Sequence, residues 1–183
     1  MKKKVTVLLL AFCLVLLAVA CGEPSPADAV KADLEDAKSS PEEILEGVGS
    51  EGFGEEATQL LIDKMLDFDY ELGEEAVNGD SATVELFLTT YPFGEIFTTV
   101  INNLFNTDMT TIAGMTEDGL DAWMDEMLIS ELNAAEKTYS ADVTVELEKV
   151  DGHWAVQESE ELSNAITGGM MDFASGMLDS LAE

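Results

Sequence analysis

The chain has 183 residues, a length that suits one domain with its own hydrophobic core. It carries 38 Asp and Glu side chains against eight Lys and no Arg, which gives a formal net charge of −30 at pH 7. This balance excludes nucleic acid as a class of partner, because phosphate backbones are held by basic side chains. It also predicts repulsion from anionic lipid head groups and wall polymers.

The first 20 residues have the layout of a signal peptide. Lysines at positions 2–4 precede an apolar run at 5–20 that ends in small residues. The run is shorter than the roughly 20 apolar residues that a transmembrane helix usually needs. We therefore predict that residues 1–20 are a signal peptide, with cleavage between Ala20 and Cys21.

Cys21 is the predicted site of lipid attachment. The sequence Leu-Ala-Val-Ala-Cys at 17–21 resembles the lipobox of bacterial lipoproteins, in which the cysteine thiol receives a diacylglyceryl group. Cys13 leaves with the signal peptide, so Cys21 has no cysteine with which to form a disulfide. We expect the chain to be held by acyl chains, such as palmitate, at the outer face of the cytoplasmic membrane, with residues 21–25 as a tether. Secretion as a soluble protein is the alternative, because Ala-Val-Ala also suits ordinary secretory cleavage.

Helix start signals open the chain after the tether. Ser25-Pro26-Ala27-Asp28 combines an N-cap, a first-turn proline and an acidic residue three positions after the cap, which predicts a helix to about Lys38. Ser40-Pro41 repeats the signal and predicts a short second helix before the glycines at 49–54. Apolar residues at helical spacing over 57–65 predict a third helix that faces a core.

Alternating segments then predict two β-hairpins. Apolar and polar residues alternate on both sides of Asn78-Gly79, and again on both sides of Asp151-Gly152. Asn-Gly and Asp-Gly between alternating segments are strong hairpin signals. Two hairpins would form a small antiparallel sheet with one solvated face.

Helical patterns occupy the rest of the chain. A helical insertion at about 93–137 separates the hairpins and carries apolar residues at helical spacing. The segment from about Glu160 has one apolar stripe, which Gly168 and Gly169 weaken, so it predicts a helix with a loose or kinked middle that packs on the sheet. We therefore predict that residues 26–183 form a single α+β domain.

Few residues could carry catalysis. His153 is the one histidine of the sequence and follows a hairpin turn, where a side chain is usually exposed. Zinc sites built from two histidines or from several cysteines cannot form. Asp67-x-Asp69-x-Glu71 is similar to the start of a calcium loop, but the glycine and the final Glu of that loop are missing at their places. We predict no catalytic residue, no metal site and no cofactor.

Aromatic residues supply a candidate binding site. An apolar pocket between the sheet and the helices could hold a small ligand. Its predicted lining residues are Phe87, Tyr91, Phe93, Phe97 and Trp123. The alternative is that these side chains simply fill the core.

Three short motifs resemble one group of proteins: Thr-Thr-Tyr-Pro-Phe-Gly-Glu-Ile-Phe at 89–97, Asp-Gly-His-Trp-Ala-Val at 151–156 and Ala-Ile-Thr-Gly-Gly-Met at 165–170. They look like small extracytoplasmic lipoproteins of Gram-positive, clostridia-like bacteria that carry a cystatin-like or NTF2-like domain of unknown function. The resemblance implies a curved sheet wrapped on helices and a lipid anchor. It implies no catalytic residue.

Two functional hypotheses follow. The first is a lipid-anchored extracytoplasmic module without catalysis, which binds a small apolar ligand, a peptide or another envelope protein. The second is an NTF2-like enzyme that uses a buried carboxylate as acid or base. A buried Asp or Glu with a raised pKa in an apolar pocket would favour the enzyme.

Overall fold

The computed structural model describes residues 24–41 and 53–181. The predicted signal peptide, its cleavage site and Cys21 lie outside the described residues. The predicted second helix lies almost entirely outside them as well. Within the described ranges, every helix is too short or too polar to cross a bilayer.

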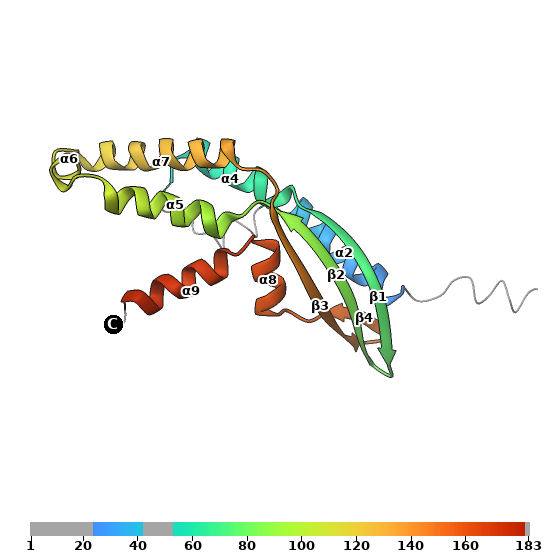
Figure 1. Ribbon diagram of the computed structural model, residues 1–183. Helices are drawn as coiled ribbons and strands as arrows, with labels where there is room; N and C mark the ends of the chain where they lie inside the picture. The colour runs from blue at the N-terminus through green and yellow to red at the C-terminus, as the bar shows by residue number, and fades with distance from the viewer. Residues whose placement is uncertain (1–23, 42–52, 182–183) are drawn as a thin grey trace, which may run out of the picture.

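A curved antiparallel sheet forms one end of the molecule (Figure 1). Its strands are β1 (Asp69–Asn78), β2 (Ser81–Thr90), β3 (Tyr139–Val150) and β4 (His153–Val156). They lie in the order β1-β2-β3-β4, and each neighbouring pair is antiparallel. Pairing of β2 with β3 joins the two predicted hairpins in one sheet. This confirms the prediction of an α+β fold with a small curved sheet packed on helices.

Local turn chemistry closes both hairpins. Gly79 has a φ of 67° in the first turn, a conformation that favours glycine. In the second turn Asp151 and Gly152 have φ values of 53° and 86°. Two positive φ values in a two-residue loop are the mark of a type I′ turn, which suits the twist of the strands. The turn sets a register that places Trp154 opposite Lys149.

Helix α2 (Pro26–Ser39) packs on the sheet and begins as predicted. Ser25 Oγ accepts a hydrogen bond from the Asp28 N–H, and the Asp28 carboxylate accepts one from the Ser25 N–H. Val30 and Leu34 are buried against the strands, where they lie about one helical turn apart. The Tyr70 hydroxyl of β1 donates a 2.6 Å hydrogen bond to Glu35 of α2, which raises the pKa of Tyr70 to about 12.

Helix α8 (Glu160–Ile166) completes the cover of the sheet. Ser159 Oγ caps it by accepting from the Leu162 N–H, and Leu162 itself is buried. The core between the sheet, α2 and α8 consists of Val30, Leu34, Phe68, Ala82, Val84, Leu86, Leu88, Val143, Val145, Leu147, Leu162 and Ala165.

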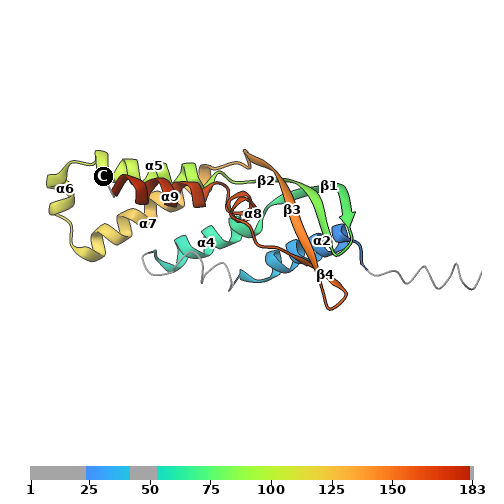
Figure 2. The ribbon, with the colours of Figure 1, turned by 90° about the horizontal axis from the view of Figure 1, so that it is seen from below.

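The other end of the molecule is helical (Figures 1 and 2). It contains α4 (Glu55–Leu66), α5 (Phe93–Asn106), α6 (Met109–Ala113), α7 (Glu117–Ala134) and α9 (Met170–Leu181). Helix α5 packs on α7 and α9, and α4 packs on α7. These helices share a second hydrophobic core of Ala57, Leu61, Met65, Phe93, Ile96, Val100, Leu128 and Leu132.

The predicted loose middle of the C-terminal helix is a complete break. Gly168 and Gly169 have φ values of 54° and 81°, which no continuing helix allows. The break turns the chain away from the sheet, and Phe173 of α9 stacks on Phe97 of α5 with ring centroids 6.1 Å apart. Of the predicted C-terminal helix, only the α8 part therefore packs on the sheet, and α9 belongs to the helical end.

A charged cluster joins the two ends. Lys137, which lies between α7 and β3, places its Nζ 2.6 Å from Asp67 Oδ1 and 2.9 Å from Asp69 Oδ2. The Tyr91 hydroxyl donates to the second oxygen of Asp67 at 3.1 Å. The acidic pair that is similar to a calcium loop therefore binds a lysine. Within residues 24–41 and 53–181, no three His, Cys, Asp or Glu side chains are grouped as metal ligands.

We expect Lys137→Gln to lower stability at neutral pH and to have no effect in strong acid. The hydrogen bond from Lys137 holds the pKa of Asp67 below its ordinary value. The stabilisation is therefore present above the unfolded pKa of about 3.9 and is lost as the pH falls through the lower folded value. Because the Asp67 side chain is 56% exposed, the expected loss at pH 7 is only about 0.5 kcal/mol.

Melting temperatures measured from pH 2 to pH 7 test this expectation. The wild-type and Lys137→Gln proteins should differ at pH 7 and converge near pH 2. Lys31→Gln removes the same charge from an exposed position on α2 and should show no such convergence. A constant difference at every pH would mean that the Asp67 ion pair is not its source.

Candidate functional site

The five aromatic residues predicted to line a pocket lie in different parts of the fold. Phe87 is 43% exposed and lies on the face of β2 opposite to the buried Leu86 and Leu88. Phe93 is fully buried in the helical core, and Tyr91 and Phe97 pack against that core. This corrects the prediction for Phe87, because alternation along a strand sends it to the far face of the sheet.

Trp123 lies on a further element, outside the residues of the helical core. It is half-buried on α7, in the helical end of the molecule. Members of the predicted set form aromatic pairs with one another and with their neighbours: Tyr91 with Phe93 and Phe97 with Phe173, each with ring centroids 6.1 Å apart, and Phe53 with Phe97 at 6.2 Å. Such separations are typical of packed cores.

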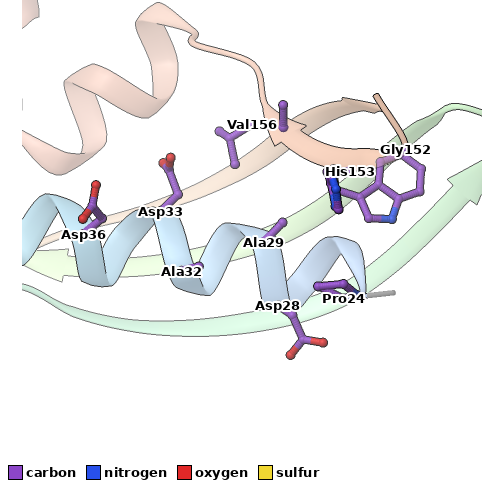
Figure 3. A pocket seen from close by; sticks show the side chains of 11 residues that line it. Pro24, Asp28, Ala29, Ala32, Asp33, Asp36, Gly152, His153 and Val156 are labelled. Atoms are coloured by element: carbon purple, nitrogen blue, oxygen red, sulfur yellow. The ribbon is translucent and has the colours of Figure 1, made fainter. Parts of the chain in front are cut away.

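A groove of about 1000 Å³ lies instead between α2 and β4 (Figure 3). No local pattern in the sequence marks this place, because its two walls are separated by more than a hundred residues of chain. The lining residues are Pro24, Asp28, Ala29, Ala32, Asp33, Asp36, Gly152, His153, Trp154, Ala155 and Val156.

One stripe of α2 forms the first wall. Ala29, Ala32, Asp33 and Asp36 recur at the three- and four-residue spacing of one helix face. The alanines leave room next to the helix, and Asp33 and Asp36 project on the side where β4 lies (Figure 3). Asp28 projects the other way, and its carboxylate is bonded to Ser25 in the helix cap.

The second wall is the edge of β4. Five consecutive residues, 152–156, line the groove. Side chains of a strand alternate between faces, so a consecutive run can border a groove only where the strand presents its edge. Within the part of the chain that the structure describes, β4 is the last strand of the sheet and pairs with β3 alone. Its second edge therefore faces the groove.

The register shows which backbone groups point outward. Lys149, opposite Trp154, directs its N–H away from β4 and donates to the Asp80 carbonyl at 2.8 Å. The N–H and C=O of Trp154 accordingly point away from β3, and those of Val156, two residues on, do the same. Among the described residues, neither Trp154 nor Val156 has a backbone hydrogen bond outside the ladder with β3.

Aromatic and imidazole groups border one end of the groove. Trp154 is half-buried, and Lys149 Nζ lies 4.9 Å from its ring centroid. His153 is exposed beside the turn, as predicted, and it also lines the groove. The groove thus combines a strand edge that no described residue pairs with, small alanines, an aromatic ring and two carboxylates on the side of the groove.

Comparisons with known proteins leave the function to be argued from these residues. No family model and no curated protein match the sequence. Among solved structures, the chain is similar to YcdA of Bacillus subtilis, a protein described as a candidate lipoprotein, with a TM-score of 0.44 and 11% sequence identity. The match covers 72% of this chain and 44% of that one, so this chain spans less than half of the length of YcdA.

Proposed function

We propose that this protein is a lipid-anchored extracytoplasmic binding module whose binding site is the groove between α2 and β4. The observation that carries the proposal is the pairing of a free strand edge with the carboxylates of Asp33 and Asp36 across the groove. Such a site offers directed hydrogen bonds and charge complementarity to a partner. The proposed activity is binding, without a chemical step.

The anchor would hold this groove near the membrane. Pro24 borders the groove and lies three residues after Cys21. An extended chain spans at most about 3.5 Å per residue, so the backbone between Cys21 and Pro24 can be no longer than roughly 10 Å. Acyl chains on Cys21 would therefore start close to the groove. Two or more acyl chains hold a protein stably on a bilayer. The groove would then meet partners at the outer membrane surface.

The enzyme hypothesis gains no support from the described residues. In these ranges the buried polar side chain is Thr90, and no Asp or Glu is buried. Asp67 and Asp108 have pKa values below the ordinary value, the first chiefly through Lys137 and the second chiefly through Thr110. A buried carboxylate with a raised pKa, the feature that would favour acid–base catalysis, is not found there.

Loss of the Cys21 thiol is expected to release the protein from the membrane. Intact-mass analysis of the membrane fraction should show a chain that begins at Cys21 and carries acyl groups. Cys21→Ala should abolish both the acyl mass and the membrane association. Cys13→Ala is the matched control, because its thiol lies in the predicted signal peptide and should not change the mature mass. A soluble product that begins with an unmodified Cys21 would overturn the anchor.

A further inference from the structure

We propose that the groove binds an extended basic peptide segment, which adds to the free edge of β4 as a fifth strand. The inference rests on the proposed function, because it names the occupant of the same groove. Addition of a strand to a sheet edge is a recurrent mode of peptide recognition, in which backbone bonds supply affinity and side-chain pockets supply specificity.

The backbone of β4 offers the required hydrogen bonds. Trp154 and Val156 direct two N–H donors and two C=O acceptors into the groove, as the register with β3 requires. A peptide strand that pairs with both residues would satisfy all four groups. β4 has four residues, and paired strands have the same rise of about 3.3 Å per residue. The paired segment of the peptide would therefore also have about four residues.

The opposite edge of the sheet is less suited to strand addition. In β1 the register shifts between Leu72 and Glu75, where two residues of β1 oppose one of β2. Bulges of this kind bend and twist an edge strand and protect it from pairing with another chain. The short ladder of β4 with β3 has no register shift. The groove also gives β4 a second wall, formed by α2.

Charge selects the class of peptide. Asp33 and Asp36 project from α2 on the side of the groove, and the chain as a whole has a net charge of −30. Lys or Arg side chains at alternate peptide positions would share one face of the added strand and could reach these two carboxylates. Ala29 and Ala32 leave space for their stems. An anionic lipid head group would instead be repelled by the same pair.

Amide exchange with defined peptides tests the inference on the full processed chain in neutral detergent micelles. The probe is a heptapeptide of alternating valine and lysine. It should protect the backbone amides of Trp154 and Val156 from hydrogen exchange. The same peptide with glutamate in place of lysine should bind at least about tenfold more weakly, and N-methylation of its pairing amides should abolish the protection.

Protein variants test the role of the two carboxylates. Asp33→Asn combined with Asp36→Asn should weaken binding of the lysine peptide about tenfold, because each rim ion pair contributes roughly threefold. Asp121→Asn combined with Glu126→Gln removes the same charge from exposed positions on α7 and should change the affinity less than about twofold. Unchanged binding in the first variant, or binding without amide protection, overturns the inference.

A photo-cross-linking residue at Ala32 separates this inference from the proposed function. Irradiation in cells should yield an adduct with a basic peptide segment. An adduct with a lipid or a metabolite would leave the binding function standing and overturn the peptide as its occupant. Absence of any adduct, together with failure of the lysine peptide to bind, would overturn both.

Discussion

Replacement of Gly168 by alanine is expected to destabilise the protein by about 3 kcal/mol or more. Gly168 has a φ of 54°, in the left-handed region that alanine adopts only with strain. A Cβ at this position would collide with the carbonyl oxygen of Tyr91 and would lie 3.1 Å from the Phe93 nitrogen. Both obstacles are backbone atoms, which cannot move aside as a flexible side chain does.

The cost is large because two chain connections cross at this point. The link between α8 and α9 contacts the link between β2 and α5, and the Gly94 N–H donates a 3.0 Å hydrogen bond to the Gly168 carbonyl. Separation of the two backbones would break this bond and displace α9 from α5. The substitution would therefore also weaken the contact between the sheet end and the helical end of the molecule.

Gly176→Ala is the matched control. Gly176 lies inside α9, and a Cβ there would meet no atom within 4 Å. Alanine is favoured over glycine inside a helix, so we expect stabilisation by about 0.5–1 kcal/mol. Free energies of unfolding from denaturant titration measure both changes. A loss below about 1 kcal/mol for Gly168→Ala would contradict the close crossing of the two links.

Phe93→Ala should cost about 3–5 kcal/mol of stability, the usual range for truncation of a buried phenylalanine. Phe93 is 0% exposed, begins α5 and packs in the helical core. Its truncation would leave a cavity at the junction of β2 with the helical insertion. Affinity for the lysine peptide should not change in the fraction that stays folded, because Phe93 is not among the residues that line the groove.

Phe105→Ala provides the control on the same helix. Phe105 is 77% exposed, so its truncation should change stability by no more than about 0.5 kcal/mol. The comparison, again by denaturant titration, separates the two interpretations of the aromatic residues. A similar small effect at both positions would mean that Phe93 lines an open pocket instead of filling the core.

Local elements could be predicted because their causes lie within a few residues. Ser25 and Asp28 form a capping box, since the two side chains bond each other's backbone one helical turn apart. Asp151 and Gly152 form a tight turn because they tolerate positive φ values. Alternation placed Leu86 and Leu88 in the core, and the same alternation, applied strictly, would have placed Phe87 on the exposed face.

Contacts between distant segments could not be predicted in this way. Lys137 binds Asp67 from 70 positions away, although many other carboxylates were available to it in the sequence. The acidic stripe of α2 is indistinguishable from a solvated helix face until β4 lies beside it. With 38 acidic residues, spacing alone cannot select the few that face a groove.

The amino-acid sequence by itself determined the α+β class, the two hairpins with their turns, the helix starts and the prediction of a lipid anchor at Cys21. Each of these depends on periodicity, on turn chemistry or on a short motif, so it is encoded locally. Only the tertiary structure decided the division into two cores, the turn of α9 away from the sheet and the groove between α2 and β4. These depend on which surfaces meet when the chain folds, and residues with the same local pattern can meet in many ways.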